Sequence, residues 1–166
     1  AVRTRDLPDW LIAAGFVRNI VWCSVFESVF ESVSETEFQS EAALNDIDVI
    51  YFCISDTSEE RDKALEARLR EPEPGLLWNQ ARMHLKNGDA PYQNTLDAMG
   101  HWPEKQTSIG VMLDSNDYVS LQHCFELSLQ FSGTINHNPA RSVEVFNKRV
   151  SGKGWLKIWP GLQIKT

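Results

Sequence analysis

The chain has 166 residues, of which 42% are hydrophobic and 23% charged, and this size and composition fit one globular domain. Its formal net charge of -7 argues against a general nucleic-acid binder, which needs a basic surface. The charge allows a nucleotide site where a few Lys or Arg side chains gather in one cleft. No apolar run reaches the length of about 18 residues that a membrane span needs.

Three cysteines, Cys23, Cys53 and Cys124, are spaced without a Cys-x-x-Cys pair. An odd number with this spacing argues against a disulfide framework or a zinc site and favours free thiols in a reducing compartment. The segment Ala1–Arg5 lacks the apolar stretch of a signal peptide. A cytoplasmic location is therefore expected.

The first readable elements are a strand, a glycine turn and a helix. Trp10–Ala14 is a short apolar run typical of a buried strand, and Gly15 ends it. The pattern then predicts a helix over Phe16–Phe26, with one face formed by Val17, Ile20, Val21 and Ser24. The acidic, Ser-rich stretch that follows, residues 27–43, fits either a longer helix or a mobile loop.

The clearest strand is Asp46–Phe52, which is rich in β-branched and aromatic residues and has no helix or strand breaker. Thr57–Glu60 has the sequence of a capping box and predicts a helix that ends near Arg70. Leu76–His84 fits either a second core strand or a junction between a strand and a helix.

The second half of the chain predicts shorter elements and an apolar tail. These are a helix at Thr95–Met99, a strand at Ser108–Leu113, a helix or strand at Leu121–Leu129, a helix at Ser142–Val150 with Val143, Phe146 and Val150 on one side, and a packing tail at Trp155–Pro160. The alternation of strands and helices predicts an α/β fold, with helices packed on a mixed twisted sheet. We expect a single domain over residues 1–166, with a core at about 7–115 and a C-terminal extension at about 116–166.

Asp46 and Asp48 are candidates for a metal site. Side chains at positions i and i+2 of a strand point to the same face, so these two carboxylates lie side by side. Adjacent carboxylates repel unless a cation sits between them, and Mg²⁺ (or Mn²⁺) prefers such hard oxygen ligands. A pair of this kind supports in-line attack at phosphorus. The alternative is a solvated strand edge that carries two acids.

The elements before this strand add an anion site. A strand, a turn at Gly15 and the N-terminus of a helix point backbone amides toward a phosphate. Arg18 follows one turn into that helix, where it contacts either a phosphate or the acidic segment at 27–41.

Two motifs carry a family resemblance. Ala14–Asn19 followed by Asn45–Asp48 resembles the polymerase-β-type nucleotidyltransferase signature, in which a glycine turn and a helix precede an Asp-x-Asp strand. The chain also resembles a bacterial family of uncharacterised nucleotidyltransferase-like proteins, through the pieces Val21-Trp22, Asn45–Phe52, Asn79–His84, Trp102–Glu104 and Trp159-Pro160.

This resemblance implies a nucleotidyltransferase-like fold and transfer of a nucleotidyl group from an NTP to an unknown acceptor. Asp46 and Asp48 would bind Mg²⁺, while Gly15, Arg18 and Asn19 would hold the triphosphate. Active members of the superfamily normally carry a third carboxylate, for which Glu104 is the best candidate here, followed by Asp114. Loss of that ligand would instead give a non-catalytic nucleotide-binding or regulatory protein. A third hypothesis is an interaction protein whose acids are merely exposed.

Two further groups have open interpretations. If Leu76–His84 is a strand, Gln80, Arg82 and His84 share one face, on which Arg82 would hold a triphosphate and His84 or Gln80 would bind a base or acceptor. The alternative is a polar face packed on a loop, with Arg82 in an ion pair. The C-terminal segment carries four basic residues, Lys148, Arg149, Lys153 and Lys157. They fit either a solvated helix face or an acceptor-binding surface.

Overall fold

The computed structural model describes residues 7–26, 47–69 and 76–166. Within these ranges, five strands form one sheet in the order β3-β2-β1-β4-β5. Their bounds are β1 Leu11–Ala14, β2 Ile47–Tyr51, β3 Leu76–Asn79, β4 Ile109–Leu113 and β5 Val119–His123. The predicted strand at 46–52 is thus confirmed, although Asp46 itself lies outside the described residues.

The sheet is mixed, as the sequence predicted. β2 and β3 run parallel, whereas β1 pairs antiparallel with β2 and with β4, and β4 pairs antiparallel with β5. In this register Asp48 lies opposite Ala13 on β1 and Leu76 on β3. The first half of β2 is therefore held between two neighbouring strands, close to the end of β1.

Two apolar clusters cover the two faces of the sheet. Val49 and Tyr51 contribute to the first cluster, against which Leu65 of helix α3 (Glu59–Leu69) packs. Ile50 lies in the second cluster with Met99 of helix α5 (Thr95–Gly100). Because side chains alternate along a strand, Asp48 shares the face of Ile50. The predicted helices near 57–70 and 95–99 are confirmed.

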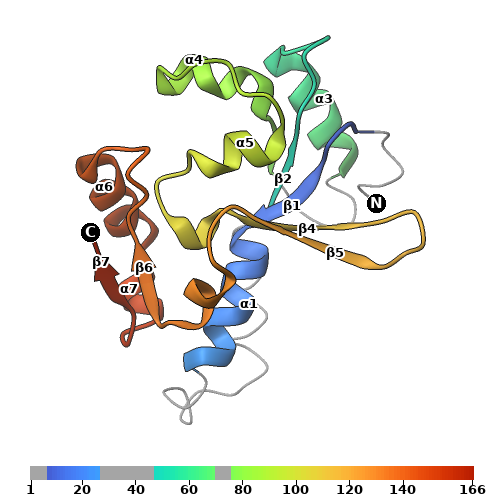
Figure 1. Cartoon of the computed structure of the whole chain (residues 1–166). Coiled ribbons are helices and arrows are strands. Elements are labelled where there is room, and N and C mark those ends of the chain that lie inside the picture. Colours follow the sequence, from blue (N-terminus) through green and yellow to red (C-terminus); the bar gives the residue numbers. More distant parts are fainter. Residues whose placement is uncertain (1–6, 27–46, 70–75) are drawn as a thin grey trace.

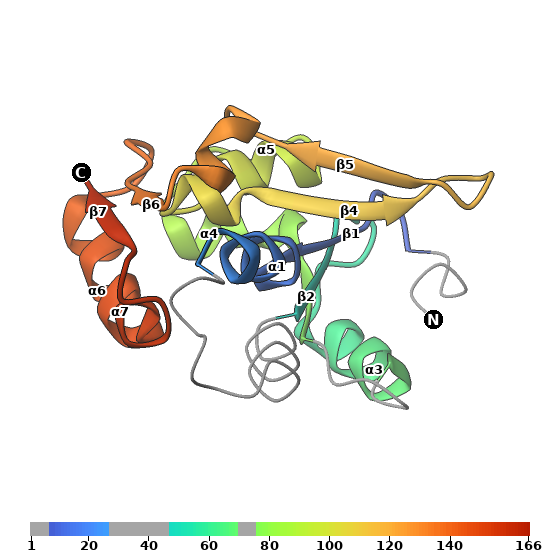
Figure 2. The ribbon, with the colours of Figure 1, turned by 90° about the horizontal axis from the view of Figure 1, so that it is seen from below.

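A third cluster joins helix α1 (Gly15–Phe26) to the C-terminal elements. These elements are α6 (Val143–Lys153), α7 (Trp155–Ile158) and a two-stranded parallel sheet of β6 (Thr134–Asn136) and β7 (Gln163–Lys165). They gather at one end of the molecule, and α3 lies at the other end (Figures 1 and 2). The buried Trp22 makes edge-to-face contacts with Trp155 and Trp159, at centroid distances of 5.8 and 5.0 Å. The predicted packing of the C-terminal tail is confirmed.

Helix α1 turns a different face inward from the one its apolar pattern indicated. The buried side includes Arg18, Asn19, Trp22 and Phe26, whereas Ile20 is 51% exposed. The reason is Trp22, whose indole packs on Trp155 and Trp159 and so sets the rotation of the helix.

Two ambiguous segments are resolved by the structure. After β3 the chain forms a 3₁₀ turn, η3 (Gln80–Arg82), and a short helix, α4 (Met83–Asn87), so Leu76–His84 is a junction between a strand and a helix. Leu121–Leu129 contains the end of β5 and the start of the 3₁₀ segment η5 (Leu127–Phe131). A further 3₁₀ turn, η4 (Lys105–Thr107), precedes β4. No helix in the described ranges is long and apolar enough to cross a membrane.

Candidate active site

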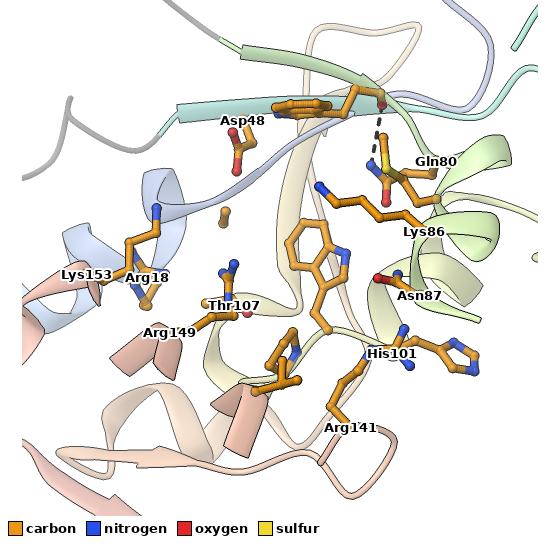
Figure 3. Close-up of a pocket in the computed structure, with 16 residues that line it drawn as sticks. Arg18, Asp48, Gln80, Lys86, Asn87, His101, Thr107, Arg141, Arg149 and Lys153 are labelled. Atoms are coloured by element: carbon orange, nitrogen blue, oxygen red, sulfur yellow. Dashed lines mark hydrogen bonds between the residues drawn. The ribbon is translucent and has the colours of Figure 1, made fainter. Parts of the chain in front are cut away.

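A cavity of about 560 Å³ opens between the sheet, α4, the segment at 101–107 and α6. Segments far apart in the sequence form its walls (Figure 3). The polar and charged residues that line it are Arg18, Asp48, Gln80, Lys86, Asn87, His101, Thr107, Arg141, Arg149 and Lys153. Trp78 and Trp102 contribute aromatic surface. A cavity with aromatic walls and many cations suits a ligand that carries both a ring and negative charge.

Asp48 is the one carboxylate among the described residues that line this cavity. It lies on β2, is partly exposed, and shares the sheet face of the buried Ile50. Figure 3 shows Asp48, Arg18, Arg149 and Lys153 toward one side of the cavity, and Lys86, Asn87 and His101 toward the other. A carboxylate therefore faces a cavity whose other charged groups are cations.

The turn between β1 and α1 borders the cavity. Ala14 lines it and has a φ of 56°, in the left-handed region that L residues rarely adopt, and the buried Gly15 begins α1. Strained backbone of this kind persists where the surrounding structure fixes it, and it is common at ligand sites. The predicted strand and helix are thus present beside Asp48, but Gly15 is the first residue of α1, and the chain changes direction at Ala14, the last residue of β1.

Arg18 lines the cavity although it is only 1% exposed. Its guanidinium carbon lies 4.5 Å from the ring centre of Trp155 and 5.2 Å from that of Trp22. Its Nε and Nη2 donate to Oδ1 of Asn19 at 3.2 and 2.9 Å. Stacking on aromatic faces and an amide acceptor hold this cation in one orientation. Asn19, itself 3% exposed, therefore helps to position Arg18.

Five Lys or Arg side chains line the cavity, in a chain whose formal net charge is -7. Buried or half-buried acids behind the walls hold two of them. Arg141 donates to both oxygens of Asp89, at 2.9 and 2.5 Å, and from Nη2 to the Tyr92 hydroxyl at 3.0 Å. The Arg141 guanidinium keeps the pKa of Asp89 below its usual range. The local field in the cavity favours an anionic ligand.

Glu104 is fully buried and lies behind the cavity wall. Its Oε1 accepts from Nε of Arg149 at 2.7 Å, and its Oε2 accepts from the Thr107 hydroxyl at 3.2 Å. Its backbone forms a β-bridge to His137, which ties the segment around 104 to the C-terminal part. Asp114 lies in the turn between β4 and β5, where its Oδ1 accepts from the backbone amides of Asn116 and Tyr118. Neither acid is among the cavity-lining residues.

Arg82 and His84 also lie outside the lining of this cavity. Arg82 forms an ion pair with the buried Asp62 of α3, which also accepts from the Tyr51 hydroxyl at 2.6 Å. His84 has its Nδ1 2.9 Å from the backbone oxygen of Ala81. Because β3 ends at Asn79 and a 3₁₀ turn follows, Gln80, Arg82 and His84 do not share one strand face as a continuous strand would require.

Lys86, Trp78 and Arg141 line the cavity although they were not predicted as site residues. Trp102 was predicted only as part of a family motif, and Arg149 and Lys153 only as part of a solvated helix face or an acceptor-binding surface; all three line the cavity. Three of the cations had a signal in the sequence. Arg141, Val145, Arg149 and Lys153 recur every four residues, which places Val145 and Arg149 on one side of the predicted helix at 142–150, with Arg141 and Lys153 just beyond its two ends. Lys148 breaks this spacing. Lys157 continues it but lies on α7, after the left-handed Gly154, and both lysines are exposed outside the cavity.

The residues present fit Mg²⁺. This ion is commonly held by one or two carboxylates together with substrate phosphates and water, and does not need a cage of protein ligands. Asp48 supplies one such carboxylate at the cavity, and Asp46, its predicted partner, directly precedes β2. In the described ranges no group of three His, Cys, Asp or Glu side chains could hold a metal by itself.

Cys53 forms a second polar cluster, away from the cavity. Its sulfur lies 3.1 Å from the Ser55 hydroxyl and accepts from Nη1 of Arg61 at 2.9 Å. Hydrogen bonds from Ser55, and further ones from the Asp56 backbone and Arg61, lower the pKa of the thiol to about 7. Burial instead raises the pKa of Cys124 to about 11.

Comparisons with known proteins agree with the fold. A sequence model described as nucleotidyltransferase matches residues 1–164. The chain belongs to this nucleotidyltransferase family. A solved structure described as an NMR structure that reveals a CCA-adding enzyme head domain is similar, with a TM-score of 0.80 and 30% sequence identity. The match covers 99% of this chain and 85% of that one. No curated protein matches the chain.

Proposed function

We propose that the protein transfers a nucleotidyl group from an NTP to an acceptor hydroxyl or phosphate, with Mg²⁺ or Mn²⁺ bound at Asp46 and Asp48. The observation that carries this proposal is Asp48, which lines a cavity that also holds five Lys or Arg side chains. A divalent ion at the carboxylates would supply charge stabilisation for the phosphates. Membership of the nucleotidyltransferase family supports the reaction class.

The chain's own residues would bind and orient the nucleotide. Backbone amides at the start of α1, next to Gly15, would contact a phosphate, and Arg18 would add a cation that Asn19 and the indoles keep in place. Trp78 and Trp102 offer aromatic surface for a base. Positioning and charge stabilisation of this kind account for most of the catalysis in phosphoryl-type transfer.

A second candidate is a non-catalytic nucleotide-binding or regulatory protein on the same fold. Two observations favour it. The buried Glu104 is engaged with Arg149 and Thr107, and Asp114 caps the turn after β4. Neither supplies a third carboxylate at the cavity lining.

Thermal unfolding with and without ligands tests the proposal. A ligand at a hundred times its dissociation constant adds about 2.7 kcal/mol to the native state, which raises the Tm by about 5–10 °C in a chain of this size. We expect this rise with Mg²⁺ and at least one NTP, and expect Asp46→Asn/Asp48→Asn to lose it. The matched control is Glu59→Gln/Glu60→Gln, which removes the same charge from exposed positions on α3.

Pyrophosphate release in the presence of candidate acceptors then separates the two candidates. Metal-dependent release that the Asp46→Asn/Asp48→Asn variant lacks would establish the transferase. Nucleotide binding without release across acceptor classes would favour the binding protein. If no NTP raises the Tm, both candidates are wrong. If the variant responds like the wild type, the metal-dependent transferase is wrong and the nucleotide-binding candidate remains.

A further inference from the structure

One side of helix α6 forms a cationic wall of the cavity. Val145, Arg149 and Lys153 line it at intervals of four residues, and Arg141 precedes the helix at the same interval. Residues four apart lie on one side of a helix, and the positions from Val145 to Lys153 extend over about 12 Å of its axis. The wall is therefore long enough to follow a chain of linked phosphates.

Arg149 is oriented from behind by a carboxylate. Its Nε donates to Oε1 of Glu104 at 2.7 Å, while its side chain remains 42% exposed and Glu104 is 0% exposed. This bond occupies Nε, and in the described part of the chain the two terminal nitrogens have no protein partner. A guanidinium held in this way presents a planar pair of N–H groups, the geometry that binds phosphate oxygens.

Both carboxylate oxygens of Glu104 have hydrogen-bond partners. The Thr107 hydroxyl donates to its Oε2 at 3.2 Å and also to its backbone oxygen at 2.8 Å, and Thr107 itself lines the cavity. A fully buried carboxylate is stable only when it is paired and hydrogen-bonded. The pair with Arg149 meets that need and points the arginine toward the cavity.

We propose that Arg149 and Lys153 bind the phosphates of the nucleotide and that Glu104 is a positioning residue that acts through Arg149. The identity of the ligand as a nucleoside triphosphate rests on the proposed function above. The role given to Glu104 differs from that of a metal ligand, because it requires an anion and no metal ion. This difference makes the inference testable with a phosphate chain alone.

Calorimetric titration with inorganic tripolyphosphate in EDTA is the test. The key variant is Glu104→Gln/Arg149→Gln, which replaces the pair by two neutral side chains of similar shape and leaves the net charge unchanged. We expect its affinity to be about tenfold weaker than that of the wild type, because charge-assisted bonds to phosphate are lost. The control is Lys148→Gln, which removes a cation from the same helix outside the cavity and should bind like the wild type.

Arg149→Lys provides a second variant that keeps the ion pair with Glu104. A lysine has a single nitrogen, so while it contacts Glu104 it cannot present the planar pair of N–H groups on two nitrogens that binds phosphate oxygens, and the affinity of this variant should also fall about tenfold. This variant decides the question if the double variant does not fold.

Three outcomes overturn the inference. They are unchanged affinity in Arg149→Lys and the double variant, an equal loss in Lys148→Gln, and a loss that is absent in EDTA and appears only in a parallel titration with Mg²⁺ in place of EDTA. The last outcome would make Glu104 a metal ligand. Titration of the wild type with NTPs separates this inference from the proposed function. If tripolyphosphate binds in an Arg149-dependent way and no NTP binds, the phosphate site on α6 is supported and the nucleoside triphosphate is rejected as its ligand.

Discussion

Asp62 offers a test of whether Arg82 has a structural role. Asp62 is 4% exposed and accepts from the Tyr51 hydroxyl at 2.6 Å, from the Asn79 amide at 3.1 Å and from Arg82 in an ion pair. In Asp62→Asn the amide group faces these donors, and Arg82 loses its countercharge. Removing one partner of a buried ion pair costs about 3–5 kcal/mol. We expect the low end, about 3 kcal/mol, because the Asn oxygen still accepts one hydrogen bond.

Thermal and urea unfolding followed by circular dichroism measure the effect. A loss of about 3 kcal/mol lowers the Tm by about 6–12 °C in a chain of this size. Glu60→Gln is the control, since it removes an exposed acid from the same helix. Adding Arg82→Met to Asp62→Asn should recover part of the loss. The orphaned cation is then absent, and one Arg82 nitrogen is already buried without a hydrogen-bond partner among the described residues.

The same variants test nucleotide binding by Arg82. If its role is structural, Asp62→Asn/Arg82→Met should bind NTPs like the wild type below its Tm. A free energy of unfolding for Asp62→Asn within about 0.5 kcal/mol of Glu60→Gln would refute the reasoning, since changes at exposed sites are of that size. A selective loss of NTP affinity would restore Arg82 as a nucleotide-binding residue.

Three further predictions concern the backbone and the thiols. Ala14→Gly should raise the free energy of unfolding, measured in urea, by about 0.5–1 kcal/mol. The left-handed φ of 56° costs an L residue about 1–2 kcal/mol, and the greater entropy of glycine in the unfolded chain offsets part of that gain. A decrease in the free energy of unfolding would contradict this. Gly110→Ala should lower the free energy of unfolding by about 1–3 kcal/mol, because the new Cβ would lie 3.1 Å from the Ile12 carbonyl oxygen and 3.2 Å from the Leu11 Cβ. An unchanged free energy of unfolding would show that the backbone of the sheet shifts to make room. The alkylation rate of Cys53 should rise with pH through a midpoint near 7, because the thiolate is the nucleophile, whereas that of Cys124 should have a midpoint near 11. Peptide mass spectrometry distinguishes the two thiols. A Cys53 midpoint near 9 would be inconsistent with its hydrogen bonds.

Local patterns predicted most elements of the fold. β2 and α3 lie where the sequence predicted them. Each has a signal contained in a few consecutive residues, namely the β-branched run at Ile47–Tyr51 and the capping residues before Glu59. The rotation of α1 was not predictable in this way. It depends on Trp22 packing against Trp155 and Trp159, more than 130 residues away along the chain.

The candidate site was predictable only in part, for a similar reason. Gly15 and Arg18 belong to one short motif and Asp48 to another, and each motif can be recognised from a few consecutive residues. Asp48 and Arg18 both line the cavity. The α6 cations belong to a helix that looks solvated by itself, because its inner side packs on residues of other elements, such as Trp22 and Ile135. The burial of Glu104 likewise has no local signal, because its partners Arg149 and His137 lie more than 30 residues further along the chain.

The residues of α6 that line the cavity differ from those that anchor the helix. Phe146 and Val150 anchor the helix in the core, whereas positions 145, 149 and 153 line the cavity and are exposed. Substitution of Val145 or Lys153 leaves the core contacts of the helix in place, whereas substitution of Arg149 also removes the partner of the buried Glu104. Under the proposed function, Val145 and Lys153 are therefore the natural place to begin redesigning the size and charge of the ligand.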